Sequence, residues 1–257
     1  AQTDKPGVTR WNDIVAKPAP LPDADIDPDA DACIFYTSGT TGRPKGAQLT
    51  HRGCLNNLMS MLFSGLSQAT ALQIATKAEP VTPPIPVAIA TTPLFHVTAN
   101  NCLAYPVTAQ GGKIVLMYKW DAGEALRLVE AEKALTLTGV PTMSREVLAH
   151  PDFAKRDTSS LLQMGGGGAP LQPDLVSKIE TQSRGVRPGT GYGLTETCGI
   201  ITSVTGDFFV GKPESCGMVM PNYEAKCVDD AGNTVPPGQT GELWVRGAQV
   251  IKGYLNR

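Results

Sequence analysis

Residues 36–46 have the composition of a loop that binds phosphate. They read Tyr-Thr-Ser-Gly-Thr-Thr-Gly-Arg-Pro-Lys-Gly and follow an apolar stretch, 32–36, that predicts a buried strand. The glycines let the backbone approach an anion closely, hydroxyl and backbone N–H groups donate to phosphate oxygens, and Lys45 adds a mobile positive charge. The run is not a Walker A loop, because Lys45 follows a proline and precedes a glycine. A plain surface loop is the alternative, which the adjoining strand and the single lysine disfavour.

Two further glycine-rich segments carry groups that suit a nucleotide. Residues 165–170, Gly-Gly-Gly-Gly-Ala-Pro, have no charge and suit close contact between backbone and a flat ligand, although a tight strand-to-helix turn explains them equally well. Residues 189–196 predict a loop in which Tyr192, between two glycines, is free to stack on a base. Three such loops in order indicate a ligand site, since loops at the carboxyl ends of parallel strands cluster at one edge of a sheet.

Three more side chains are candidates for the chemistry itself. Thr195 is placed to reach a phosphate oxygen, and Glu196 to hold Mg²⁺, which needs only one or two carboxylates when substrate phosphates supply other ligands. The alternative for Glu196 is a solvated carboxylate at the start of a helix. His96 follows an apolar strand and Pro-Leu-Phe; it is either a structural histidine or part of the site, and both interpretations stay open.

The elements that must position these groups alternate along the chain. Thr50 is the expected N-cap of a helix, Asp121 and Glu124 form a capping box, and Pro173 opens a helix. The pattern predicts an α/β fold of layered, mostly parallel sheets with flanking helices, followed by a smaller antiparallel, barrel-like segment. The expected strands are 32–36, 87–90, 113–117, 135–140 and 161–164, and the expected helices are 51–64, 97–110, 122–133 and 173–184.

Composition excludes several classes of protein. The 22 basic and 24 acidic residues give a net charge of −2, which argues against a nucleic-acid partner held by bulk electrostatics. No apolar run is long enough to span a membrane, although contact with a membrane surface is compatible with a lipid-like substrate. The six cysteines show no Cys-x-x-Cys spacing and predict buried thiols in a cytoplasmic protein, not disulfides or a zinc site.

The motifs together resemble the adenylate-forming enzymes, the superfamily of acyl-CoA synthetases, luciferases and peptide-synthetase adenylation domains. Residues 36–46 resemble its signature loop, and the later motifs follow in the right order over most of 32–257. The Pro-Leu-Phe-His and Gly-Gly-Ala-Pro-Leu forms are closest to acyl-CoA synthetases. The matching motifs are 92–96, 166–170, 191–196 and 241–247.

The resemblance implies that a carboxylic acid, expected here to be a fatty acid, reacts with ATP to give an acyl-adenylate and pyrophosphate, and that coenzyme A then takes the acyl group. Alternatives are an aryl-CoA ligase, a luciferase-like enzyme and a non-catalytic nucleotide-binding module. The implied catalytic residues are Thr195, Glu196, Lys45 and His96, with Glu196 and Thr37 as ligands of Mg²⁺. The implied nucleotide-binding residues are Thr37, Ser38, Gly39, Thr40, Thr41, Gly42, Lys45, Gly167, Gly168, Ala169, Pro170, Gly191, Tyr192, Gly193 and Thr195. An apolar acyl pocket is expected from Leu94, Phe95, Val97 and Val140.

Departures from the family pattern shape the expected domain organisation. We expect a linker or partial N-terminal segment at 1–31, an ATP- and acyl-binding core at 32–214, and an antiparallel segment at 215–257. The ribose-binding aspartate, the hinge and the small lysine-bearing lid of the family are not among these residues, so the chain resembles a large-domain fragment that we expect to be inactive by itself. Thr190 also stands where many acyl-CoA synthetases have glutamine.

Overall fold

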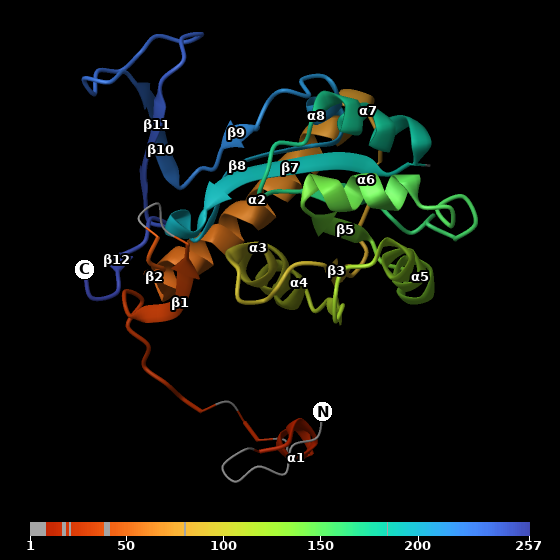
Figure 1. Cartoon of the computed structure of the whole chain (residues 1–257), viewed down its shortest axis with the longest axis horizontal. Coiled ribbons are helices and arrows are strands. Elements are labelled where there is room, and N and C mark those ends of the chain that lie inside the picture. Colours follow the sequence, from red (N-terminus) through yellow and green to blue (C-terminus); the bar gives the residue numbers. More distant parts are fainter. Residues whose placement is uncertain (1–8, 17–18, 21, 39–41, 80, 184) are drawn as a thin grey trace.

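A seven-stranded sheet forms the centre of the computed structural model, which describes residues 9–16, 19–20, 22–38, 42–79, 81–183 and 185–257 (Figure 1). The strand order is β4-β3-β5-β6-β7-β8-β9, with the first five strands parallel and the last two antiparallel. The chain direction across the sheet reverses between β3 and β5, and ligands in such sheets bind beyond the carboxyl ends at that point. The strands are β3 (Val87–Ala90), β4 (Lys113–Leu116), β5 (Thr136–Gly139), β6 (Gln163–Gly166), β7 (Arg187–Leu194), β8 (Gly199–Thr205) and β9 (Met218–Val219).

Helices cover both faces of this sheet, so the predicted layered α/β fold is confirmed. Ile89 packs in the main core with residues of β5, β6 and three helices, whereas its neighbours Ala88 and Ala90 pack against Leu103 and Val107 on the other face. This alternation follows from the two-residue period of a strand. The first face carries α5 (Ala122–Glu132), α6 (Pro141–Ala149) and α7 (Pro173–Gln182), and the second carries α2 (His51–Thr76), α3 (Val97–Ala99), the π-helix η1 (Asn100–Ala104) and α4 (Tyr105–Ala109).

The first predicted strand belongs to a separate small sheet, and the prediction that this strand is buried is wrong. β1 (Asp31–Thr37) forms an antiparallel hairpin with β2 (Lys45–Thr50), and β12 (Gly253–Tyr254) pairs with the other edge of β2. β1 is therefore an edge strand that packs on one side only. Its alternate residues Ile34 and Tyr36 are exposed, although the sequence there is continuously apolar.

The predicted helix signals are confirmed at three N-termini. The hydroxyl of Thr50 accepts the N–H of Gly53 at 3.0 Å, and Pro173 opens α7. The carboxylate of Asp121 accepts the N–H of Glu124 at 2.8 Å, but Glu124 binds Arg127 instead of closing the capping box. The helix α2 continues to residue 76, past the predicted end at 64, because only Gly65 interrupts the good helix formers that follow.

Pro141 starts an element that the sequence analysis did not include. It follows the fourth predicted strand, 135–140, which the structure ends at Gly139 of β5, and it occupies the first turn of α6. Proline is favoured there, because its missing N–H has no partner within the helix at that position.

The antiparallel strands near the C-terminus are confirmed, but they do not form one barrel. β10 (Tyr223–Val228) and β11 (Glu242–Gly247) make a two-stranded ribbon that projects from the body, while β9 joins the large sheet and β12 the small one (Figure 1). At the other end, α1 (Trp11–Val15) is a short helix that lies apart from the body. The remaining short helices are η2 (Thr195–Thr197) and α8 (Gly206–Val210).

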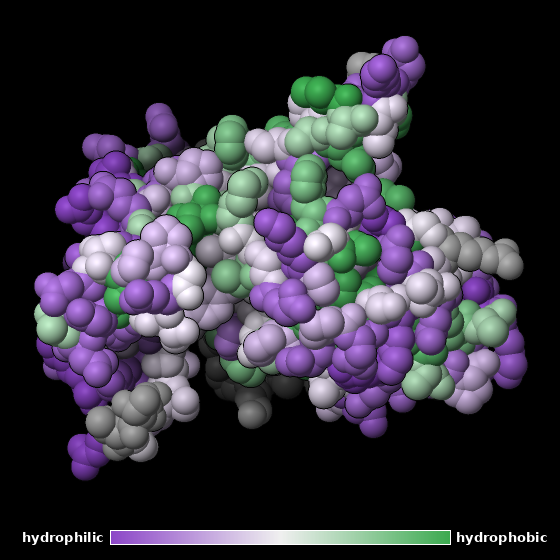
Figure 2. Space-filling model, turned by 90° about the horizontal axis from the view of Figure 1, so that it is seen from above, coloured by the Kyte–Doolittle hydropathy of each residue, from purple (hydrophilic) through white to green (hydrophobic). Residues whose placement is uncertain are grey.

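The surface is mixed in character. Seen from above, hydrophilic residues cover much of it and apolar residues gather in separate groups (Figure 2). The exposed apolar residues of α2 recur at helical spacing: Leu55, Met59, Phe63 and Leu66. None of the described helices is long and apolar enough to cross a membrane.

The six cysteines are all free thiols, as expected, but only two of them are fully buried. Cys54 and Cys198 are buried and pack together, Cys33 and Cys102 are half-buried, and Cys216 and Cys227 are exposed. No group of three potential metal-ligating His, Cys, Asp or Glu side chains occurs within the described part of the chain.

Candidate active site

One cavity of about 930 Å³, which we call the main cavity, brings the three predicted loops together. The β1–β2 hairpin contributes Thr37, Ser38 and Lys45, the end of β6 contributes residues 166–168, and β7 with η2 contributes Thr195 and Glu196. The expectation that all three leave one parallel sheet is wrong. The hairpin belongs to the small sheet, and residues 189–194 are part of strand β7, not a loop. The site is therefore built between two sheets.

A tyrosine connects the two charged side chains of this site. The hydroxyl of Tyr254 donates to Oε1 of Glu196 at 2.8 Å, and Nζ of Lys45 lies 5.2 Å from the centre of the Tyr254 ring. The hydrogen bond to Glu196 raises the pKa of the Tyr254 hydroxyl, since a nearby carboxylate disfavours the phenolate. Tyr254 thus holds the carboxylate on one side while its ring faces the lysine. The sequence analysis did not identify Tyr254, whose place depends on the pairing of β12 with β2.

The segment that carries Thr195 and Glu196 is fixed by hydrogen bonds. The carbonyl of Glu196 accepts the N–H of Ile251 at 3.0 Å. The carbonyl of Thr197 accepts the hydroxyl of Tyr223 at 2.8 Å, and the hydroxyl of Thr197 donates to backbone carbonyls on both sides of the turn. Thr195 and Glu196 are therefore presented on a short turn whose backbone groups are bonded to several other elements.

Two buried asparagines bind the residues that follow. Asn57 of α2 accepts the N–H of Ile200 at 3.0 Å and donates to the carbonyl of Asn101 at 3.2 Å. Asn101 in turn donates to the carbonyl of Cys198 at 2.8 Å. Both side chains are fully buried, so these hydrogen bonds have no water to replace them. The pair joins α2 and η1 to the end of the turn at residues 195–197.

The two glycines that flank Tyr192 have different neighbours. A Cβ added at Gly193 would overlap the backbone carbonyl of Gly199 on β8, whereas one added at Gly191 would meet only the Ile200 side chain at 3.2 Å and the carbonyl of Thr202 at 3.6 Å. Gly193 therefore allows β7 and β8 to approach each other beside Thr195.

We expect Gly193→Ala to destabilise the fold much more than Gly191→Ala does. The first variant must move backbone, which costs about 3 kcal/mol, while the second needs only a small shift of a side chain, about 1 kcal/mol. Urea unfolding followed by circular dichroism measures both. Equal midpoints for the two variants would contradict the assigned contact.

A second cavity of about 540 Å³ adjoins the first and shares Gly168, Thr190, Gly191, Gly193 and Leu194 with it. Tyr192, exposed to 42%, lies on its wall together with the backbone of 168–170. A flat ring bounded by an aromatic side chain and by glycine backbone fits this space. The arrangement is compatible with the expected stacking position of Tyr192.

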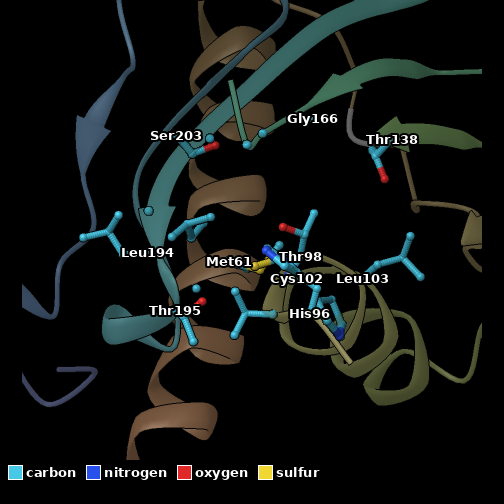
Figure 3. A pocket seen from close by; sticks show the side chains of 18 of the residues that line it. Met61, His96, Thr98, Cys102, Leu103, Thr138, Gly166, Leu194, Thr195 and Ser203 are labelled. Atoms are coloured by element: carbon cyan, nitrogen blue, oxygen red, sulfur yellow. The ribbon is translucent and has the colours of Figure 1, made fainter. Parts of the chain in front are cut away.

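His96 lines the main cavity and also has a structural contact (Figure 3). Its Nδ1 accepts the N–H of Thr98 at 3.1 Å and so caps α3, leaving Nε2 without a partner among the described residues. Both interpretations from the sequence are thus compatible with its position.

The inner part of the main cavity differs from the expected acyl pocket. Of the four residues expected to line it, only Val97 does; Leu94 and Phe95 are exposed, and Val140 is not part of the lining. The motif residues 93–95 form a turn that points outward, so their apolar character says nothing about the cavity. The apolar lining comes instead from α2, η1 and α4: Met61, Leu103, Pro106 and Val107.

The other predicted residues fall into three groups. Lining the main cavity are Thr37, Ser38, Lys45, His96, Gly167, Gly168, Gly191, Gly193, Thr195 and Glu196, and lining the second are Gly168, Ala169, Pro170, Gly191, Tyr192 and Gly193. Gly42 lies in the hairpin loop at a positive φ of 79° and lines neither cavity. Gly39, Thr40 and Thr41 lie outside the described residues.

Known proteins match this chain over nearly its whole length. A family model described as AMP-binding enzyme matches residues 2–255. The chain belongs to the AMP-binding enzyme family. A feruloyl-CoA synthase from Amycolatopsis is 34% identical over 236 residues, which is 92% of this chain and 45% of that protein. The chain therefore spans less than half the length of this curated relative of the AMP-binding family.

Solved structures of the same family confirm the fold. The inhibitor-bound N-terminal domain of FACL13 from Mycobacterium tuberculosis superposes with a TM-score of 0.77 at 25% identity, covering 95% of this chain and 56% of that one. The o-succinylbenzoate coenzyme A synthetase from Bacillus subtilis, in complex with ATP and magnesium ion, gives 0.72 at 27% identity, covering 96% and 48%. The resemblance seen in the motifs thus extends to the whole arrangement of sheets.

Proposed function

We propose that this chain is the ATP- and acid-binding part of an acid–CoA ligase. The observation that carries the proposal is the main cavity, where the phosphate-type hairpin loop, Thr195 and Glu196 open onto a space that continues between the large sheet and helices η1 and α4. A nucleotide at the polar end and a carboxylic acid in the inner part would meet at Thr195. In this reaction the acid attacks the α-phosphate of ATP, pyrophosphate leaves, and coenzyme A takes the acyl group from the adenylate.

The chain's own residues would contribute position and charge. Lys45 and the hydroxyls of Thr37 and Ser38 bind the departing phosphates, Thr195 contacts the α-phosphate, and His96, whose Nε2 has no partner among the described residues, lines the same cavity and contacts the acid. Such preorganised groups stabilise developing charge where solvent is restricted. Tyr192 and the 168–170 backbone hold the adenine in the second cavity.

The donor set fits Mg²⁺. Glu196 is the only carboxylate among the described residues that line the main cavity, and its Oε2 has no partner among the described residues. A single carboxylate is enough when phosphate oxygens and waters complete the six ligands, and the Thr37 hydroxyl lies on the same cavity. When bound there, the ion would neutralise charge on the phosphates.

For the acid, two features favour an aromatic substrate over the fatty acid suggested by the motifs. The relative named above makes feruloyl-CoA, and the solved ligase with ATP acts on o-succinylbenzoate. The cavity is also lined by hydroxyl groups from Thr98, Thr138 and Ser203, which a saturated chain cannot use (Figure 3). We propose that the substrate is an aromatic or arylpropenoic acid that carries no charge apart from its carboxylate and is similar in size to the acids of these two proteins.

A pyrophosphate-release assay on the full-length protein tests the proposal. The panel contains arylpropenoic acids, benzoic acids and fatty acids of several lengths, each with ATP, Mg²⁺ and coenzyme A. We expect acid-dependent release, fastest with an arylpropenoic acid. A fatty acid as the best substrate would overturn the acid class, and no release with any acid would overturn the ligase function.

A further inference from the structure

The main cavity extends along the whole length of the parallel strands. Its lining includes Gly166 at the carboxyl end of β6 but also Thr136 and Gln163, the first residues of β5 and β6, and Pro86 just before β3. Because β5 and β6 have four residues each, the lining extends over about 10 Å from the first to the last residue of these strands, at about 3.3 Å per residue. The inner end therefore lies far from Lys45 and Glu196, which are the only formally charged residues in the described lining.

The floor of this inner part is flat and made of small residues. Ala88, Thr136, Thr138 and Gly189 lie on the same face of neighbouring strands, as their register shows, and helices η1 and α4 lie opposite. Apart from Gln163, this sheet face carries no large side chain, which leaves room for a planar group lying against it. A ring fits such a floor better than a flexible chain does.

Gln163 is the long polar side chain on that floor. Its backbone pairs with Arg187, yet its amide lies over Gly189, two residues further along β7: a Cβ added at Gly189 would overlap Nε2 of Gln163 and lie 3.2 Å from its Cδ. The side chain therefore leans along the sheet toward the carboxyl ends, where the reaction would take place. Glycine at position 189 provides the space for this orientation.

The amide of Gln163 has no hydrogen-bond partner among the described residues, although the residue is half-buried. The other glutamine of the lining, Gln110, is different, because its Nε2 already donates to the carbonyl of Pro106 at 2.9 Å. The Gln163 amide is not among the fully buried unpaired groups, so it is open to the cavity and a ligand there can supply its partner. A free amide aimed along a substrate-sized cavity thus has the properties of a ligand contact.

We propose that Gln163 determines specificity by hydrogen bonding to a neutral polar substituent, a hydroxyl or carbonyl, at the end of the acid remote from its carboxylate. The inference rests on the proposed ligase function and deepens it. The absence of charge from the inner lining selects a neutral substituent, since a second carboxylate there would have no counterion. The hydroxyl of Thr136, which precedes Leu137 on β5, is on the same floor and can complete the contact.

The test compares two acids in the full-length protein: 4-hydroxyphenylpropenoic acid and the same acid without its hydroxyl. We expect wild type to prefer the hydroxylated acid in kcat/KM, because a site built to bind a hydroxyl leaves polar groups unpaired with the other acid. In Gln163→Met, which keeps length but removes the hydrogen bond, the preference should fall about tenfold or more. In the matched control Gln110→Met it should change less than about twofold.

The ratio of the two acids is insensitive to partial loss of folded protein, because both rates fall together. Should Gln163→Met be inactive, Gln163→Asn, which shortens the reach, is expected to lower the preference in the same way. If both acids react but wild type shows no preference, or if Gln163 variants keep it, the role of Gln163 is overturned while the ligase function stands. If neither acid nor any other in the panel reacts, it is the ligase function that fails.

Discussion

Replacing Glu196 by glutamine is expected to lower the rate of acyl-adenylate formation by about 100-fold or more in the full-length protein, with little change in stability. The carboxylate is the only one that lines the described part of the main cavity, and the one side-chain hydrogen bond it accepts comes from Tyr254, which lines the same cavity. Glutamine keeps the size and accepts the same hydrogen bond but removes the charge that would hold Mg²⁺. Loss of metal-based charge stabilisation is worth several kcal/mol, and each 1.4 kcal/mol is tenfold in rate.

The measurement is pyrophosphate exchange as a function of Mg²⁺ concentration. Glu196→Gln should need more Mg²⁺ for half-maximal rate, which a merely structural role would not produce. Tyr254→Phe removes the hydrogen bond to Glu196 but keeps the carboxylate, so it separates the positioning of Glu196 from its charge. The rate of this variant should fall by less than about tenfold. The control is Glu79→Gln, an exposed glutamate away from both cavities. An unchanged Mg²⁺ dependence in Glu196→Gln would exclude Glu196 as the metal ligand.

The helix boundaries that local chemistry determines could be predicted from the sequence. Thr50, Asp121 and Pro173 act within one helical turn, so their effect is visible in a few consecutive residues. The same is true of β3, whose four apolar residues were predicted with the right bounds. These signals do not depend on the rest of the fold, which is why they are reliable.

Elements that depend on distant partners could not be predicted in this way. β7 contains four glycines or prolines among its eight residues and looks like a loop, but it lies between β6 and β8, where small residues are needed. Gly165 shows why: a Cβ there would overlap the carbonyl of Gly189 on β7, and its φ is +142°. Likewise β1 is as apolar as a buried strand, and only its position at a sheet edge makes half of it exposed.

The residues of the candidate site also divide into those that a local motif identifies and those that depend on distant contacts. The side chains that touch the ligand stand in motifs, so Lys45, Thr195 and Glu196 could be identified in advance. The groups that position them could not. Tyr254 reaches Glu196 across 58 residues and Asn57 reaches Ile200 across 143, and neither has a neighbouring residue that indicates its role.

Asn57 therefore offers a strong test of how the site is held. Asn57→Ala removes a fully buried side chain and leaves the half-buried N–H of Ile200 and the buried carbonyl of Asn101 without partners, so we expect a loss of about 3 kcal/mol in the free energy of unfolding. Gly199 supports this expectation, because it adopts a φ of +147° and a Cβ there would overlap Oδ1 of Asn57. Glycine at position 199 therefore leaves the room that the Asn57 side chain occupies. Because the turn with Thr195 directly precedes these residues, kcat should fall more than the KM for ATP rises.

The adjacent Asn56→Ala provides the matched control. Asn56 is half-buried and bonds to Asn222 at 2.8 Å and to the carbonyl of Arg52 at 2.9 Å on the outer side of α2, so its loss should cost only about 1 kcal/mol and leave kcat unchanged. Urea unfolding and steady-state kinetics, at a temperature where both variants are folded, measure the two effects. If Asn57→Ala lost stability but kept kcat, the asparagine would hold the fold without positioning the turn. Loss of both, in Asn57→Ala alone, would show that the buried pair links the packing of α2 to the geometry of Thr195 and Glu196.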